Sequence, residues 1–95
     1  MFQRLRGHDP LTAFDGYPLE RVVELHVAGG SERTTGDYAW VDDDHTPGVL
    51  ADTWTIVEHV VPRAPNLKAV VFECERNAMD VCLPGFARLA ALLDA

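Results

Sequence analysis

Three segments of the chain are apolar at most positions and predict β-strands. They cover residues 21–28, 38–45 and 67–75, which read RVVELHVA, YAWVDDDH and LKAVVFECE. The second segment is rich in β-forming residues until its acidic end. A polar stretch at residues 31–37 predicts a loop between the first two strands. Near-continuous apolar runs of this length are typical of parallel strands that are covered on both faces.

Two later segments have the spacing of amphipathic helices. In residues 46–62, Thr46 can serve as N-cap and Pro47 occupies the first helical position, where proline is favoured. Pro62 ends this helix. Its apolar positions recur at spacings of four, three and four, at Leu50, Trp54, Val57 and Val61. A last helix is predicted over residues 84–95.

The predicted order is strand, loop, strand, helix, strand, helix, and it indicates an α/β fold with a parallel sheet. Residues 1–20 lead into this arrangement, and residues 21–95 form it. The chain has no internal repeat at the level of sequence identity and no linker that would divide it. Residues 1–95 are therefore expected to form a single domain.

The composition excludes several classes of protein. The 95 residues are 47% hydrophobic and 24% charged, as in ordinary globular proteins. A net charge of −7 without a basic cluster argues against nucleic-acid binding. The apolar runs are far shorter than the ~20 residues that span a bilayer, so no membrane association is expected. The N-terminus lacks the apolar core of a secretory signal, which predicts a cytoplasmic protein with both cysteines reduced.

Each predicted strand ends in a pair of His, Asp or Glu residues two positions apart. The pairs are Glu24 with His26, Asp43 with His45, and Glu73 with Glu75. Because side chains alternate along a strand, the two members of each pair share one face. The carboxyl ends of parallel strands carry the sites of α/β folds. These six side chains are therefore expected to converge at one edge of the sheet.

A single pair of this kind is also typical of a solvated strand end, but three pairs in the same position favour a shared site. Four gathered carboxylates repel one another, and few cations lie near them in the sequence, so a divalent metal ion would stabilise the group. Carboxylate and imidazole ligands suit Fe(II), Mn(II) or Zn(II), and open positions suggest non-haem iron. By alternation Cys74 faces the core, and Cys82 is expected in a loop.

The ordered motifs resemble a known family. The segments YPLERVVELHVAGG, DDDHTPGVLADTWTIVEHVV and VVFECERN, with LPGFARLAALL after them, are similar to the C-terminal third of the DUF692 proteins. These multinuclear non-haem iron-dependent oxidative enzymes include the methanobactin biosynthesis iron enzyme. The family pattern has a Glu-x-His strand followed by Ala-Gly, an Asp-x-His followed nine residues on by Trp, and a strand ending in Glu. The resemblance covers nearly the whole chain.

The resemblance implies the C-terminal portion of a TIM-type (β/α)8 barrel whose mouth holds two or three iron ions, with fewer or none in this chain alone. It implies four metal ligands, His26, Asp43, His45 and Glu73. Glu24 is a further candidate that either binds metal or orients a ligand, and Glu75, where the family usually has Asp, is a secondary one. The family uses O2 to modify cysteines or neighbouring backbone in ribosomally made precursor peptides. A small partner protein typically recruits the leader peptide.

The chain is short for such a barrel. A (β/α)8 barrel takes ~250 residues, and about three parallel strands with two or three helices are less than half of one. An open parallel sheet would leave two unpaired edges and an exposed inner face. The chain is therefore expected to be incomplete alone. It is a fragment, a decayed remnant, or a subunit that pairs with a barrel-completing chain or with a second copy of itself.

The residues leave three functions open, and with them the question whether this chain alone is an enzyme. The first is the C-terminal part of an iron- and O2-dependent oxidative enzyme. The second is part of a metal-dependent hydrolase or isomerase that uses Zn or Mn on the same kind of barrel. The third is a non-catalytic remnant or subunit. The sequence does not single out a catalytic residue in any of them.

Overall fold

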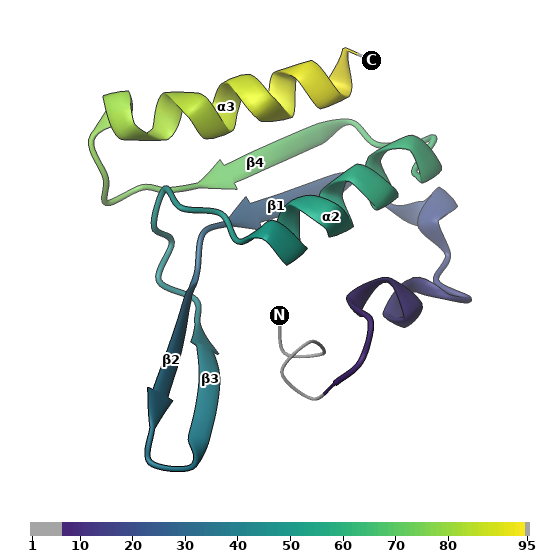
Figure 1. Ribbon diagram of the computed structural model, residues 1–95. Coiled ribbons are helices and arrows are strands. Elements are labelled where there is room, and N and C mark those ends of the chain that lie inside the picture. Colours follow the sequence, from purple (N-terminus) through teal and green to yellow (C-terminus); the bar gives the residue numbers. More distant parts are fainter. Residues whose placement is uncertain (1–6, 95) are drawn as a thin grey trace.

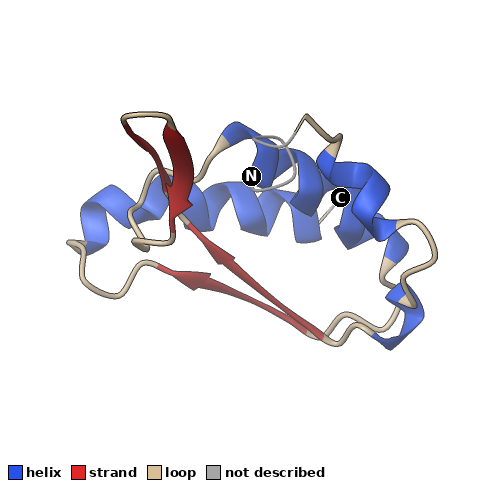
Figure 2. Ribbon diagram, turned by 90° about the horizontal axis from the view of Figure 1, so that it is seen from below, coloured by secondary structure: helices blue, strands red, loops and turns tan. Residues whose placement is uncertain are grey.

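The computed structural model describes residues 7–94, which form a layer of helices over a layer of strands (Figures 1 and 2). Two of its helices are long, and the short 3-10 turns are marked η. In chain order the elements are η1 Pro10–Phe14, η2 Leu19–Arg21, β1 Glu24–Ala28, β2 Ser31–Thr35, β3 Tyr38–Asp42, α2 Ala51–Val60, η3 Val61–Arg63, β4 Ala69–Glu73 and α3 Met79–Leu93. The lead-in predicted for residues 1–20 contains η1 and η2, and its residues 1–6 lie outside the described range.

The central sheet consists of β1 and β4, which run parallel and are connected through α2. Both long helices cover the same face of this sheet (Figure 2). Apolar side chains from that face and from the helices form one core. Its buried members are Val27, Trp54, Val57, Phe72, Cys74, Cys82 and Leu89. The prediction that the apolar strand faces pack under the helices is confirmed, including the core position of Cys74.

The opposite face of the β1–β4 sheet is open. Glu24 and His26 are exposed on it, and Val71 keeps 37% of its surface accessible. Within the described part of the chain, each of the two strands is hydrogen-bonded to a neighbour along one edge only. Parallel sheets are normally covered on both faces. The arrangement is therefore that of a partial α/β domain.

The second predicted strand does not join this sheet. Residues 31–37, predicted as a loop, form β2 and the turn of an antiparallel hairpin with β3, and the hairpin projects from the body of the molecule (Figure 1). Gly36, with a φ of 55°, lies in the two-residue turn that such hairpins favour. This short turn makes β3 pair with its neighbour in sequence instead of with β1. Two strands are therefore parallel instead of three, and Asp43 and His45 follow β3 instead of belonging to it.

The helix after the hairpin also begins later than predicted. α2 begins at Ala51 with Leu50 as N-cap, so the prediction of Thr46 as N-cap is wrong. The Thr46 carbonyl oxygen lies against Gly29, where a Cβ atom would clash with it. This contact fixes Thr46 in the loop before the helix. At its other end α2 passes into η3, which contains Pro62, the residue predicted to end the helix.

The last helix begins more than one turn before Pro84, the residue at which the sequence predicted its start. Cys82 therefore lies in a helix and not in a loop. Pro84 removes one helical N–H donor, but burial of Cys82 against β4, with Sγ 3.7 Å from the carbonyl oxygen of Cys74, keeps the first turn helical. Gly85 permits this close packing because a Cβ atom there would clash with the ring of Phe72.

These elements confirm the α/β class and the parallel strands at its centre. None of the helices within residues 7–94 has the length and apolar character needed to cross a membrane.

Candidate functional site

Glu73 joins the two histidines of the predicted site. Its Oε1 lies 2.6 Å from Nδ1 of His26, and its Oε2 lies 3.1 Å from Nε2 of His45. Glu73 is the last residue of β4, His26 lies on β1, and His45 belongs to the loop between β3 and α2. One carboxylate therefore connects three separate segments of the chain.

The three remaining predicted residues surround this centre. Asp43 places Oδ1 3.3 Å from Nε2 of His45, and Glu75 places Oε1 2.8 Å from Nδ1 of the same ring. Glu24 places Oε1 3.4 Å from Nε2 of His26. All six residues therefore form one connected cluster. They come from two parallel strands and two loops, and not from three parallel strands as predicted.

The sheet register and one glycine explain why these segments meet. His26 and Glu73 are diagonal neighbours on the open face of the β1–β4 sheet, because the register places Glu73 opposite the second residue after His26. Gly29 follows β1 directly and admits the carbonyl group of Thr46. That close approach brings the loop that carries His45 to the carboxyl end of β1. Gly29 therefore helps to position the His45 loop at the site.

The hairpin contributes polar contacts that the sequence interpretation missed. Ser31 donates a hydrogen bond from Oγ to Oδ2 of Asp44 at 2.6 Å, and this bond is the main reason that the pKa of Asp44 is lowered. Arg33 lies on the same strand and donates from Nε to Oδ2 of Asp42 at 2.9 Å. The Gly-Asp turn between two stretches of β-forming residues is a hairpin signal. Reading it would have paired β2 with β3, with Ser31 opposite Asp42 and Arg33 on the same strand two residues away.

Asn77 makes a second unpredicted contact with the site. Its Nδ2 donates to the carbonyl oxygen of His45 at 2.8 Å and to that of Cys74 at 3.1 Å. The bond to His45 spans 32 residues and joins a side chain to the backbone. Spacing arguments describe side chains on a shared element, so no pattern in the sequence indicates this contact.

Hydrogen bonds to carboxylates raise the pKa of both histidines in the cluster. For His26 the main cause is Glu73, and Glu24 adds a smaller effect, while partial burial opposes them. For His45 the main cause is Glu75. The pKa of Glu75 is lowered, first by a hydrogen bond from its own backbone and then by His45. The two imidazoles therefore hold protons more strongly than a free histidine does.

The two cysteines lie in the core behind the cluster. Both are buried and neither forms a disulfide. Contact with Cys82 and burial raise the pKa of Cys74 to about 11. At neutral pH the Cys74 thiol is therefore protonated, which makes it a poor metal ligand because metal binding requires the thiolate.

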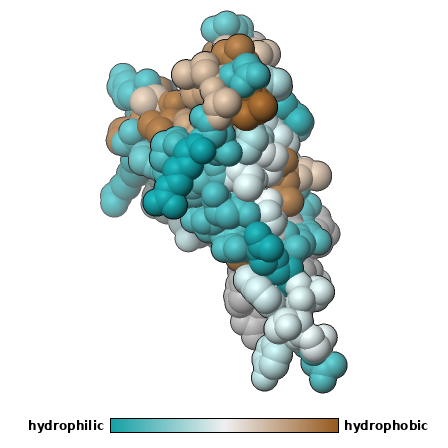
Figure 3. Space-filling model, turned by 90° about the vertical axis from the view of Figure 1, so that its left-hand side faces the viewer, coloured by the Kyte–Doolittle hydropathy of each residue, from teal (hydrophilic) through white to brown (hydrophobic). Residues whose placement is uncertain are grey.

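The cluster borders a hollow at the carboxyl ends of the parallel strands. The hollow has a volume of about 350 Å³. It is lined by Asp43, Asp44, His45, Glu75 and Arg76. Figure 3 faces this side of the molecule, and hydrophilic residues dominate its middle. Arg76 is the cationic residue of the lining.

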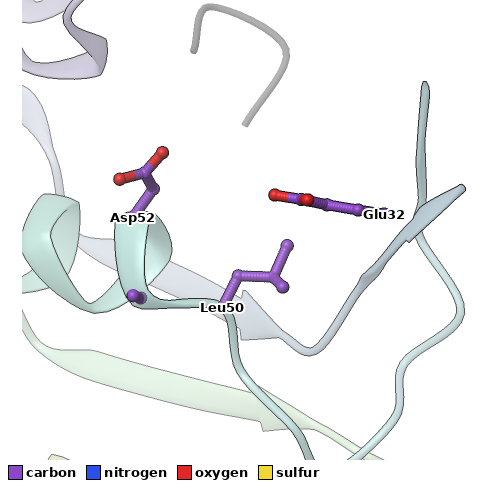
Figure 4. Close-up of a pocket in the computed structure, with 4 residues that line it drawn as sticks. Glu32, Leu50 and Asp52 are labelled. Carbon is purple, nitrogen blue, oxygen red and sulfur yellow. The ribbon is translucent and has the colours of Figure 1, made fainter. Parts of the chain in front are cut away.

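A second hollow lies between the hairpin and the start of α2. It has a volume of about 420 Å³ and is lined by Glu32, Leu50, Ala51 and Asp52. The carboxylates of Glu32 and Asp52 extend toward this space from opposite sides (Figure 4). None of the six predicted site residues lines it, so this hollow is separate from the predicted site.

The cluster contains the donor types of a metal site, but its side chains pair with one another. Among residues 7–94, no group of three or more His, Cys, Asp or Glu is placed to hold a metal ion. Both ring nitrogens of His26 and of His45 lie next to carboxylate oxygens instead. The predicted convergence of the six residues is observed, and their role as metal ligands stays a prediction.

Comparison with known protein families gives a match over most of the chain. Residues 3–92 match the family described as RiPP precursor modification enzyme MbnB/TglH/ChrH. The chain belongs to this family. All six clustered residues fall inside the matched region of the MbnB/TglH/ChrH family. No curated protein and no solved structure matches the chain.

Membership in the MbnB/TglH/ChrH family confirms the resemblance found in the sequence. The family's description names modification of a precursor of a ribosomally made peptide. A peptide is therefore the class of substrate that membership implies.

Proposed function

We propose that this chain supplies the C-terminal part of an iron- and O2-dependent oxidative enzyme that modifies cysteine-containing ribosomal peptides. The proposed metal ligands are His26, Asp43, His45 and Glu73, and Glu24 and Glu75 bind metal or orient the histidines. Family membership supports the peptide substrate. The position of Glu73 between two histidines is the observation that carries the proposal of a metal site.

The spacing of the donor atoms supports this proposal. Neighbouring ligands on one ion with bonds of about 2.1 Å lie about 3 Å apart. His45 Nε2 lies 3.1 Å from Glu73 Oε2 and 3.3 Å from Asp43 Oδ1. Each of these two pairwise distances is compatible with two ligands of one ion, and the three side chains would have to turn away from one another to surround it. Their chemistry, carboxylate oxygen and imidazole nitrogen, is that of non-haem iron sites.

The charge of the cluster also favours a bound cation. Four carboxylates surround two imidazoles, and like charges at such distances destabilise a fold unless a positive charge lies among them. In the metal-free chain protons on His26 and His45 would supply that charge, and the neighbouring carboxylates raise the pKa of both imidazoles. Metal binding requires neutral imidazole, so loading the site would release these protons.

The roles of the residues follow from their contacts. Iron would supply the O2 chemistry of the reaction when bound. Glu73 would hold the two histidines in a fixed relation, and Glu75 would orient His45 through Nδ1. The hollow beside Asp43 and Arg76 would receive the substrate peptide.

The open sheet supports the proposal that the chain is one part of a larger barrel. The β1–β4 sheet exposes the face that carries the cluster, and its strands are paired along one edge only in the described residues. Further parallel strands would pair with those edges and enclose the cluster at the mouth of a TIM-type barrel. By resemblance, a small protein that recruits the leader peptide would act with the assembled enzyme.

Anaerobic reconstitution with Fe(II), followed by iron analysis, tests this function. The chain is loaded alone and together with the N-terminal barrel portion of a family member. We expect bound iron, and a loss of about tenfold or more in affinity for Glu73→Gln and His45→Gln. His59→Gln is the matched control, because His59 lies on α2 and contacts Phe14 instead of the cluster.

Two results would contradict the proposal. One is the absence of bound iron from the wild-type chain in both preparations. The other is iron binding that His45→Gln leaves unchanged. Turnover with Zn or Mn in the absence of O2 would instead favour the metal-dependent hydrolase or isomerase.

A further inference from the structure

The side-chain amide of Asn77 bridges two segments that carry the cluster. Both bonds use Nδ2, which donates to the carbonyl oxygen of His45 at 2.8 Å and to that of Cys74 at 3.1 Å. Cys74 lies between Glu73 and Glu75 in the sequence. An amide NH₂ group has two hydrogens, and here both are directed at backbone carbonyl groups. Asn77 therefore ties the His45 loop to the end of β4.

His45 needs such an anchor because its backbone is strained. Its φ is 53°, and it is the non-glycine residue with positive φ in the described part of the chain. Conformations of this kind cost roughly 1 kcal/mol or more and persist where surrounding contacts enforce them. The ring of His45 is held by Glu73 and Glu75, and its carbonyl oxygen is held by Asn77. Contacts of both the side chain and the main chain therefore hold His45 in place.

We infer that Asn77 is a positioning residue of the cluster. It holds the backbone of His45 in the conformation that directs the imidazole between Glu73 and Glu75. The inference rests on the proposed function for its link to metal binding, and on the hydrogen bonds alone for its link to the position of the ring. It assigns a role to a residue outside the six predicted site residues.

The chemistry of the contact identifies the informative substitution. Asn77→Asp keeps the shape of the side chain but removes both donors and places oxygen atoms against two carbonyl oxygens. The matched control is Asn66→Asp. Asn66 makes the same kind of bond, from Nδ2 to the carbonyl oxygen of Glu20 at 2.6 Å, but joins η2 to the loop before β4, at the other end of the sheet.

Two measurements on the full chain test the inference. The first is anaerobic titration with Co(II) alone, followed through its visible absorption. We expect Asn77→Asp to weaken Co(II) binding about tenfold or more and Asn66→Asp to change it less than about twofold. The second is made without metal and records nuclear Overhauser contacts of the His45 ring. Contacts with Glu73 and Glu75 should be lost in Asn77→Asp, while the His26–Glu73 contact remains.

Further variants separate positioning from general stability. Asn77→Ala removes both donors without adding charge and should repeat the loss of the His45 ring contacts if Asn77→Asp fails to fold. Asn77→Gln keeps the amide donors on a longer side chain and should recover most of the Co(II) affinity. A purely structural role would lower the unfolding midpoint of Asn77→Ala without moving the His45 ring.

The outcomes distinguish this inference from the proposed function. If the wild-type chain does not bind Co(II) but the His45 ring moves in Asn77→Asp, the metal proposal fails and the positioning role stands. If the wild type binds Co(II) and Asn77→Asp retains both the affinity and the ring contacts, the positioning role is overturned. Loss of affinity with unchanged ring contacts would overturn it as well.

Discussion

His26 and Glu73 are 47 residues apart in the sequence, and their side chains meet at 2.6 Å, Nδ1 to Oε1. The contact joins two parallel strands on the open face of the sheet. It also leaves the second oxygen of Glu73 directed at His45. This single carboxylate is therefore the point at which the strand register and the loop conformation are coupled.

Replacing Glu73 and Glu75 one at a time should lower the pKa of a different histidine in each case. In Glu73→Gln the pKa of His26 should fall toward its ordinary value of 6.5, because Glu73 is the main cause of its increase. In Glu75→Gln the pKa of His45 should fall, because Glu75 is its main partner, and that of His26 should stay unchanged. Nuclear magnetic resonance titration of the metal-free chain measures both values. Equal shifts of both histidines in the two variants would contradict this assignment.

The stability of the metal-free chain should decrease as the pH rises above neutrality. A histidine with a raised pKa stabilises the fold fully below its ordinary value of 6.5, and this contribution is lost as the pH rises through the folded-state value. Glu75 and Asp44 have lowered pKa values, so they stabilise the fold at higher pH. This contribution is lost as the pH falls through their folded-state pKa values. The free energy of unfolding should therefore be highest near about pH 5–6. Urea unfolding at a series of pH values measures it.

The matched control for this pH profile is the double variant Glu73→Gln with Glu75→Gln. Without these carboxylates the histidine pKa values should lie nearer to 6.5, and the decrease in stability above pH 6.5 should become smaller. A decrease of the same size in the double variant would assign the effect to other groups.

Gly29→Ala should disturb the site without touching any of its six residues. The added methyl group would clash with the carbonyl of Thr46, and relief of the clash would move the loop that carries His45. Overpacking of this kind costs roughly 1–3 kcal/mol in the free energy of unfolding. Gly48→Ala is the control from the same loop, because a Cβ there has only an ordinary contact with Thr46. Similar unfolding free energies for the two variants would contradict the role of Gly29.

Arg88 should stabilise the helix layer mainly by stacking. Its guanidinium lies 4.2 Å from the ring centre of Trp54 and 2.9 Å from Oε1 of Glu58. We expect Arg88→Ala to lower the free energy of unfolding by about 1 kcal/mol, and Glu58→Gln by less than about 0.5 kcal/mol because exposed ion pairs contribute little. Chemical unfolding of the two variants shows whether the stacking on Trp54 or the ion pair with Glu58 contributes more. A larger loss in Glu58→Gln would show that the ion pair dominates.

One part of the convergence, that of His26 and Glu73 on the β1–β4 sheet, could be predicted from the sequence because it depends on alternation along strands, whereas Asp43, His45 and Glu75 reach the cluster from loops. Glu24 and His26 share a face of β1, as predicted, and Glu73 meets His26 because it ends the neighbouring parallel strand. The core position of Cys74 follows from the same rule. Local periodicity and the polarity of each position contain this information.

The connections between elements could not be predicted by the same reasoning. The hairpin depends on a two-residue turn at Gly36, which was interpreted as part of a polar loop. The start of α2 depends on the contact between Thr46 and Gly29, and that of α3 on the burial of Cys82. The last two are contacts between positions separated in the sequence, which local propensity does not predict, whereas the Gly-Asp turn at Gly36 is a local hairpin signal. Family membership, in contrast, was visible in the ordered motifs because they cover nearly the whole chain.

Within residues 7–94, β1 and β4 each have one edge without a strand partner, and this feature makes the assembly of the chain measurable. In a parallel pair, alternate residues direct their backbone groups to the neighbouring strand, and the others point outward to water. Deuterium should therefore replace every second amide proton of each strand quickly and the intervening ones slowly. Addition of a strand to either edge would erase this alternation on that strand alone, so the exchange pattern identifies both whether a partner has bound and at which edge.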